Sequence, residues 1–244
     1  MATHSGQIKC SRGGAISRNN ILLCDKGIGG VLTLAEWQLE HTIEHSREKE
    51  FIKSMIEDAQ IDTANINRVL KQNRKLLLYI DTLTKVCYNY EPAEKNDFNI
   101  YRLYREVASV TEAIKPTERT LTQLKNSGGM RLIRKKVVAD ILILYDGFGK
   151  DVVTQRAILD GLTMDNISSS YELFNFKFYN PGSYQGISQN PVLLTHNKEK
   201  IIQFANRIVT YGAGTFVFCQ QLEKMNKEAV KLIEALRKEY HLTE

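Results

Sequence analysis

The sequence predicts an all-α protein, an antiparallel helical bundle with a very long N-terminal helix. Apolar residues recur every three or four positions over most of the chain, which is the helical period. Only four of the 244 residues are proline, so few helix breaks are enforced. No segment alternates apolar and polar residues for long enough to require a strand. We expect residues 33–244 to form one helical bundle domain and residues 1–32 to form a flexible N-terminus with a weak hydrophobic segment.

The composition is that of a folded domain, with 43% hydrophobic and 25% charged residues. The net charge of +5 is not gathered on one segment, because acidic and basic residues interleave, as in Arg47-Glu48-Lys49-Glu50. This pattern favours a solvated helical surface over a nucleic-acid-binding face. The four cysteines include no C-x-x-C pair and are too few for a disulfide scaffold.

The first helix is predicted from near Leu34 to Tyr90. Three neighbouring apolar rows, beginning at Ile52, Met55 and Ile56, repeat every seven residues along it. Such a wide stripe favours bundle packing over a two-stranded coiled coil. Two polar residues, Asp62 and Asn73, interrupt the stripe. Asn73 could fix the helix register, but a position at the rim of the core is the favoured interpretation.

Two shorter helices should follow the turn at residues 91–97. Asp97 is predicted to cap the second helix, which must end before Pro116 because a proline disfavours helical geometry in the preceding residue. Thr117 is predicted to cap a short third helix. The glycines at residues 128–129 should end this helix, since glycine readily takes the left-handed conformation of a helix terminus.

The remaining chain should contain two more helical regions around one long loop. A helix restarts after Met130 and continues through residues 152–174 with breaks at Gly161 and at the serines 168–170. Residues 174–179 alternate aromatic and polar side chains and could form a short strand or an extended loop. Asn197 or Thr195 can cap the last region. Its YGAG segment, residues 211–214, either interrupts the helix or allows close helix packing.

The stretch TLTQLKNSGGMRLIRKKVVADILILYD, residues 120–146, and the upstream stretch REKEFIKSMIEDAQID resemble a family of uncharacterised bacterial proteins. The matching residues are Glu48 to Asp58, Leu121, Leu124, Asn126, Ser127, Gly128, Arg131, Leu132, Ile133, Lys136 and Tyr145. The resemblance covers residues 30–150. It implies a short cytoplasmic start, one membrane-spanning helix and a helical domain outside the membrane, but no activity.

Residues 21–37 occupy the place of that span. Basic residues and no acidic ones precede them, as at a cytoplasmic membrane face. However, Asp25 and Lys26 interrupt the segment, and its uncharged part is about half of the ~20 residues needed to cross a bilayer. If the segment inserts, we expect a bacterial inner-membrane protein with an extracytoplasmic helical domain. If it does not insert, we expect a cytoplasmic protein.

The sequence EHTIEH contains His41, Glu44 and His45 in the H-x-x-E-H arrangement of one class of zinc peptidases. Positions i and i+4 place both histidines on one helix face, as zinc requires. A catalytic zinc also needs a third protein ligand and a shielded pocket, and no second motif supplies them. The charged surroundings indicate a solvated helix. We therefore expect no metal, no cofactor and no catalytic residue.

A basic cluster around the NSGG turn is the best candidate binding site. Its residues are Lys125, Ser127, Gly128, Arg131, Arg134, Lys135 and Lys136. The cations and the free backbone amides of the turn could together bind an anion or an acidic partner. The alternative is that the basic residues only begin a solvated helix.

These observations favour a non-enzymatic helical interaction, scaffold or sensory domain, which residues 21–37 could anchor to a membrane. The expected partner is another protein, or a second copy of the chain bound through its helices. The second hypothesis is a cytoplasmic protein that binds nucleic acid or another polyanion through residues 125–136, although the interleaved charges make nucleic acid the weaker candidate.

Overall fold

The computed structural model describes residues 18–92, 96–109, 114–179, 186–187 and 190–242, with side chains from residue 37 onward. The chain divides into two units, Met1–Arg47 and Glu48–Glu244. In the described residues helices dominate and the only β-pairing is an isolated bridge between Tyr179 and Ile187. The prediction of an all-α fold with a very long N-terminal helix is therefore confirmed.

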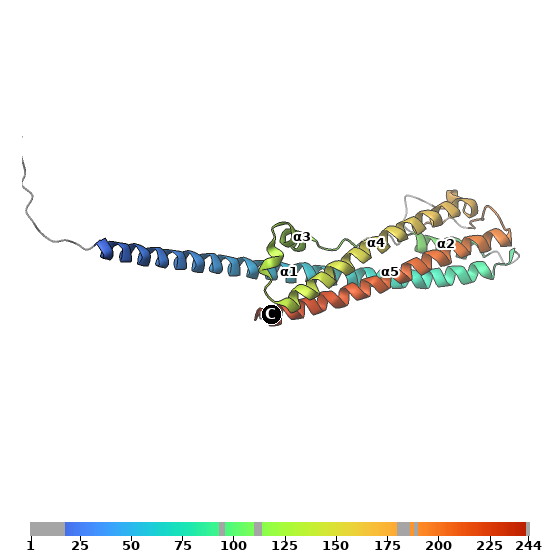
Figure 1. Cartoon of the computed structure of the whole chain (residues 1–244). Helices are drawn as coiled ribbons and strands as arrows, with labels where there is room; N and C mark the ends of the chain where they lie inside the picture. The colour runs from blue at the N-terminus through green and yellow to red at the C-terminus, as the bar shows by residue number, and fades with distance from the viewer. Residues whose placement is uncertain (1–17, 93–95, 110–113, 180–185, 188–189, 243–244) are drawn as a thin grey trace, which may run out of the picture. The chain divides into compact units, whose positions relative to one another are not determined.

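Five α-helices and two short 3-10 helices make up the described chain. They are α1 (Arg18–Tyr88), α2 (Asp97–Ala108), α3 (Arg119–Asn126), η2 (Gly129–Leu132), α4 (Lys136–Leu173), η3 (Phe176–Phe178) and α5 (Lys198–Glu239). In the second unit, α4 and α5 lie side by side with the C-terminal half of α1, and the shorter α2 and α3 lie against these long helices (Figure 1).

The apolar stripe of α1 forms the core as predicted. Ile52, Ala59 and Ile66 are among the residues of the three rows that are buried. The two polar interruptions are buried as well. The rim interpretation of Asn73 is wrong, because its side-chain amide donates to the Val69 carbonyl at 2.9 Å and so satisfies itself within α1.

Both long C-terminal helices are continuous. The expected breaks in α4 are wrong, because the hydroxyls of Ser169 and Ser170 donate to carbonyls one turn earlier and stay within the helix. The YGAG segment allows close packing rather than an interruption. A Cβ on Gly212 would lie 2.9 Å from Ile80 Cγ2, so the absence of a side chain lets α5 approach α1.

Aromatic rings hold α2 against the ends of α4 and α5. The Phe174 ring lies 4.9 Å from that of Tyr101, 4.5 Å from that of Tyr104 and 5.5 Å from that of Phe204, measured between centroids. These rings are buried. The segment expected to be a short strand or extended loop is instead the 3-10 turn η3 followed by the single bridge at Tyr179.

The predicted caps have mixed outcomes. Asn197 caps α5 as expected, since its side chain accepts from the backbone N–H of Lys200 at 3.1 Å. The capping roles of Asp97 and Thr117 are wrong. The N-cap residues of α2 and α3 are Asn96 and Glu118, and neither helix has a side-chain cap. Asp97 and Thr117 instead make tertiary hydrogen bonds.

Residues 21–37 lie within α1, but the side chains of residues 21–36 are outside the described set. Across the described part of the chain, no helix combines the length and the apolar character needed to cross a bilayer. The possible anchor at residues 21–37 depends mainly on side chains that lie outside the described set.

Candidate functional site

The predicted basic cluster spans the connection between α3 and α4. Lys125 lies in the last turn of α3, Arg131 in η2, and Lys136 is the first residue of α4. Ser127 and Gly128 form the turn between α3 and η2, and Gly128 has a φ of +67°. The expectation that a left-handed glycine ends the third helix is confirmed.

Acidic residues of this chain neutralise part of that cluster. Lys125 donates to Asp146 Oδ1 at 2.7 Å, and Lys135 lies 3.7 Å from Glu239 Oε2. The backbone N–H of Arg134 donates to the buried Glu48 at 3.3 Å. In the residues described, Arg131 and Lys136 have no acidic partner. The net positive charge open to an anion is therefore smaller than the sequence suggests.

The pKa of Asp146 shows how strongly this carboxylate holds Lys125. Partial burial would raise the pKa of this carboxyl, but hydrogen bonds from Lys125 and Lys150 outweigh burial and lower the pKa below its usual value. The carboxylate thus stays ionised and keeps both lysines in place. Ser127 is also occupied, because its hydroxyl donates to the Gln123 carbonyl at 2.7 Å.

Two aspartates of α1 bind the start of α3. The fully buried Asp62 accepts from the backbone N–H and hydroxyl of Thr117, at 2.9 and 2.7 Å, and from the Tyr145 hydroxyl. One turn earlier, Asp58 accepts from the Thr120 N–H at 3.0 Å and from Arg119 at 2.7 Å. Burial, followed by the Asp62 charge, raises the pKa of Tyr145. These carboxylates replace the missing side-chain cap of α3.

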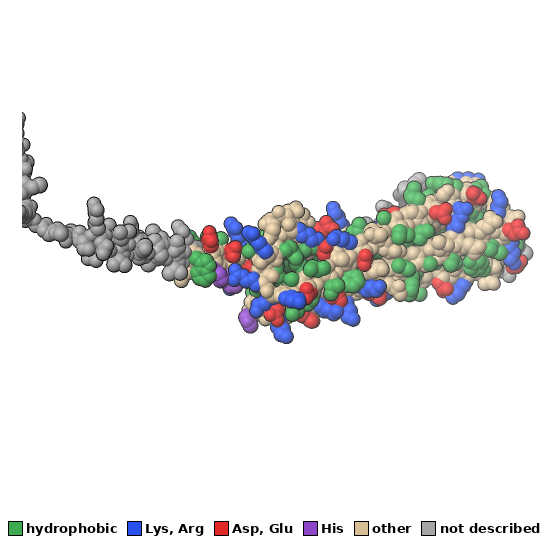
Figure 2. Space-filling view, in the orientation of Figure 1, with side chains coloured by type: hydrophobic (Ala, Val, Ile, Leu, Met, Phe, Trp, Pro, Cys, Tyr) green, Lys and Arg blue, Asp and Glu red, His purple; other side chains and the backbone are tan. Residues whose placement is uncertain are grey.

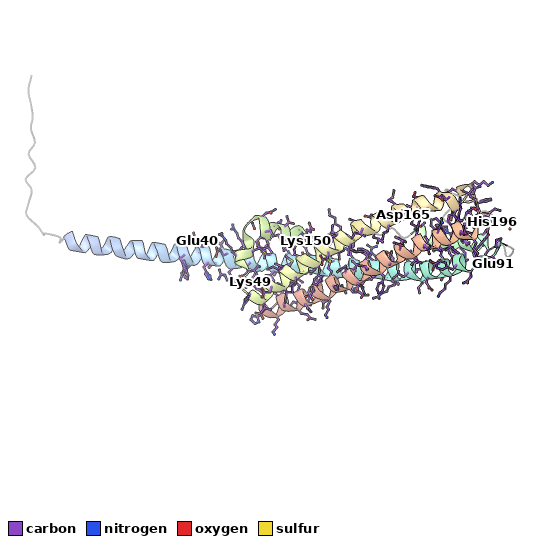
Figure 3. The ribbon with its side chains drawn as sticks, turned by 45° about the vertical axis from the view of Figure 1, so that its right-hand side comes forward. Glu40, Lys49, Glu91, Lys150, Asp165 and His196 are labelled. Carbon is purple, nitrogen blue, oxygen red and sulfur yellow. The ribbon has the colours of Figure 1, made fainter. Side chains whose placement is uncertain are left out.

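A third buried aspartate, Asp97, lies near the α1–α2 connection. It accepts from the Tyr90 hydroxyl at 3.0 Å and from the Leu193 N–H at 2.9 Å, and His196 Nε2 lies 3.0 Å away. Burial, followed by the hydrogen bond to Asp97, raises the pKa of Tyr90. His196 and Glu91 lie at the same end of the bundle (Figure 3). Asp97 therefore joins the start of α2 to the segment before α5.

Sequence spacing did not reveal the partners of these buried aspartates, although Asp62 interrupts an apolar stripe. Both carboxylate oxygens of Asp58, Asp62 and Asp97 accept from donors of the chain itself, which indicates a structural role. His41 and His45 are exposed on α1. Among the described side chains, no group of three or more histidine, cysteine, aspartate or glutamate residues is arranged to hold a metal ion.

Among the described residues, α4 exposes more large hydrophobic side chains than any other helix. Seven large hydrophobic side chains of this helix are exposed: Val137, Ile143, Leu144, Val153, Ile158, Met164 and Tyr171. The longer α5 exposes four, which are Val209, Phe216, Val217 and Val230. Figure 2 shows such apolar side chains at the surface of the bundle, between charged ones.

The exposed side chains of α4 are aligned. All except Val153 fall into two rows that repeat every seven residues, one through Ile143 and one through Leu144. Between these two rows lies a third, which contains Asp140, Gly147, Thr154, Gly161 and Ser168. Added Cβ atoms on Gly147 and Gly161 would meet no atom within 4 Å. The two apolar rows therefore flank an open, shallow strip of helix.

The charge of α4 differs from that of the whole protein. The helix has six acidic and three basic residues, a net charge of −3, whereas the chain has +5. Asp140 and Asp151 are exposed and have no ion-pair partner in the described residues, while Asp165 lies 3.8 Å from Arg207. Lys150 and Asp165 mark the course of this helix in Figure 3. The exposed face of α4 therefore mixes apolar side chains with carboxylates, since Asp151 lies in the same row as Leu144 and Asp140 in the same row as Gly147.

Comparisons with protein-family models, curated proteins and solved structures found no match. The functional proposal therefore rests on the residues of this chain alone.

Proposed function

We propose that this chain is a non-enzymatic helical interaction domain whose α4 binds an amphipathic helix of a partner protein. The alignment of large exposed hydrophobic side chains along α4 carries the proposal. Scattered exposed apolar residues are normal on protein surfaces, but six large ones in two neighbouring rows of one helix indicate a binding surface, although Lys150 and Asp151 interrupt these rows. An amphipathic helix fits such a face because its own apolar residues repeat with the same period.

The chemistry of α4 also specifies its partner. The small residues Gly147 and Gly161 allow the partner helix to approach closely, and the flanking rows through Ile143 and Leu144 supply apolar contact on both sides. The exposed carboxylates of Asp140 and Asp151, which lie among the apolar side chains of this face, favour lysine or arginine close to the apolar stripe of the partner. The partner segment is therefore an apolar helix with basic flanks.

Site-specific photo-crosslinking in cells tests this proposal. Benzoylphenylalanine replaces Leu144 in one variant and Leu78, an even more exposed residue of α1, in the control. We expect position 144 to give a cross-link that position 78 does not, to a segment with an apolar helical stripe and basic flanks. Equal cross-linking at both positions would contradict the proposal. A cross-link to a second copy of this chain would show that α4 mediates self-association and does not bind a different protein.

Quantitative binding of the synthetic partner segment then tests the contact itself. The double variant Leu144→Lys/Ile158→Lys should weaken binding about tenfold or more, because it removes apolar contact and repels basic flanks. Leu78→Lys is the matched control and should leave the affinity unchanged. Fluorescence anisotropy of the labelled segment gives both affinities, and circular dichroism checks that the variants fold.

A polyanion bound at the α3–α4 connection is the second candidate function, supported by the exposed cations Arg131 and Lys136. It predicts salt-dependent oligonucleotide binding that Arg131→Gln and Arg134→Gln weaken. An affinity that responds neither to salt nor to these substitutions would exclude it.

A further inference from the structure

A polar groove between α1 and α5 lies outside the surface just proposed. Its lining consists of Asn67, Leu70, Lys71, Arg74, Glu223, Asn226 and Lys227, and its volume is about 380 Å³. Two contacts bridge the helices across it. Arg74 Nη2 donates to Glu223 Oε1 at 2.7 Å, and Asn226 Nδ2 lies 3.4 Å from Asn67 Oδ1. The groove is therefore formed by facing side chains of two packed helices.

The lining has three cations and one carboxylate. Lys71 and Lys227 are exposed and have no acidic partner in the described part of the chain. The Arg74–Glu223 pair is itself half-exposed, with side-chain exposures of 64% and 50%, and such pairs are weakly held. Arg74 can therefore turn toward a bound anion without a large cost.

This part of α1 also departs from the interleaved charges of the rest of the chain. Between Asp62 and Asp81 the helix has no acidic residue, but it has Arg68, Lys71, Arg74 and Lys75. Positive charge confined to consecutive turns of one helix raises the local potential at the groove. An anion at the groove meets attraction from several side chains rather than from one.

Asn226 supplies the second, independent observation. Its side-chain oxygen is buried and has no hydrogen-bond partner among the described residues. Buried polar atoms almost always have partners, so this amide is placed to contact something else. If the amides of Asn226 and Asn67 both rotate by a half turn, Asn67 Nδ2 donates to Asn226 Oδ1 and the Asn226 nitrogen takes the buried position, from which it can donate to an anion.

We infer that the α1–α5 groove binds a small anion bearing a phosphoryl group, through Lys71, Arg74, Lys227 and the amide of Asn226. A phosphoryl group has several acceptor oxygens, which matches a lining of three cations and one amide. The groove volume of about 380 Å³ suits a small molecule.

Isothermal titration calorimetry of the full chain with sodium pyrophosphate at low ionic strength tests the inference. The wild-type chain should bind pyrophosphate. The double variant Lys71→Ala/Lys227→Ala should weaken binding about tenfold or more, because it removes two charged contacts. The matched control Lys53→Ala/Lys238→Ala removes the same charge from exposed positions of the same two helices outside the groove, and should change the affinity less than about twofold.

A second variant tests the amide. Asn226→Leu keeps the size and charge of the lining but removes its polar atoms, and it should also weaken binding several-fold. Circular dichroism and the thermal midpoint show whether each variant is folded. No binding by the wild-type chain, or equal weakening in the control, would overturn the inference. Tighter binding of oligo-dT than of pyrophosphate would also overturn it, in favour of a polymeric ligand.

These outcomes are separable from those for α4. The Leu144→Lys/Ile158→Lys variant should retain pyrophosphate binding in the same titration, because the groove lining contains no residue of α4. Loss of pyrophosphate binding in that variant would contradict the assignment to the α1–α5 groove.

Discussion

Asp62 and Asp97 are two buried aspartates that bind their surroundings in parallel ways. Each accepts from a tyrosine hydroxyl and from the backbone N–H of a loop residue, which is Thr117 for Asp62 and Leu193 for Asp97. The third contact differs. For Asp62 it is a threonine hydroxyl, and for Asp97 it is His196, whose side chain is 44% exposed.

The difference shows what each site can do. Asp62 is sealed from solvent and supported by Asp58 one turn away, so both carboxylates hold the start of α3 from within α1. Asp97 lies at the edge of the bundle, beside an exposed ring and a loop that continues to α5. We therefore expect removal of Asp62 to affect the stability of the whole bundle, and removal of Asp97 to act mainly on that edge.

The largest expected effect comes from Asp62→Ala. It leaves two donors of Thr117 and the Tyr145 hydroxyl without their acceptor, at a cost of about 3 kcal/mol or more in the free energy of unfolding. Urea denaturation followed by circular dichroism measures this loss. Asp81→Ala is the control, because Asp81 is exposed on the same helix and its carboxylate forms an exposed ion pair with Lys85. Similar losses in both variants would contradict the importance of the buried site.

A smaller effect is expected for Asp97→Ala, about 2 kcal/mol, because three donors lose an acceptor but water can reach them at the edge. The loss should be local. Hydrogen exchange should accelerate at the Leu193 amide, while amides in the middle of α1 keep their protection. Uniform acceleration throughout the bundle would contradict the comparison with Asp62.

The hydroxyl of Tyr145 should contribute about 1 kcal/mol, because Asp62 keeps its other donors when this one is removed. Tyr145→Phe retains the ring in the core and isolates the hydrogen bond. Urea denaturation measures the difference, with Tyr171→Phe as the control on an exposed residue of the same helix. A loss as large as that of Asp62→Ala would show that Tyr145, rather than Thr117, is the main partner.

The smallest effect concerns alkaline pH. The pKa of Tyr145 is raised in the folded chain, so the stabilisation is complete below about pH 10, the unfolded value, and is lost as pH rises toward the folded pKa. By pH 10.5 the raised pKa of Tyr145 should account for a loss of less than about 1 kcal/mol in the free energy of unfolding. Tyr145→Phe should therefore show a shallower loss of stability above pH 10 than the wild-type chain. Equal slopes in urea titrations at these pH values would contradict the raised pKa.

Spacing in the sequence predicted the helices well, because a helical stripe is a property of neighbouring positions. The rows beginning at Ile52 and Ile56 are buried as expected, and Gly128 ends α3 with a positive φ. Spacing did not predict the partners of polar residues. Asp97 is of a residue type that often caps helices and lies at the start of α2, but its side chain binds residues of another segment instead.

The candidate surfaces divide in the same way. The cations of the α3–α4 connection stand out in the sequence, yet Lys125 and Lys135 pair with acids located 21 and 104 residues away. For the apolar residues of α4, only packing decides which face of the helix stays exposed. The α1–α5 groove cannot be inferred from either helix alone, since its lining alternates between them.

The sequence by itself determined that this chain is helical, where its core stripe lies and which residues end several helices, because these depend on contacts a few positions apart. Only the tertiary structure decided that Asp58 and Asp62 bind the start of α3, that α4 keeps an apolar face exposed and that α1 and α5 form a cationic groove. Each of these depends on side chains that are far apart in the chain. Residue spacing does not show which distant residue will pair with a buried charge or cover an apolar row.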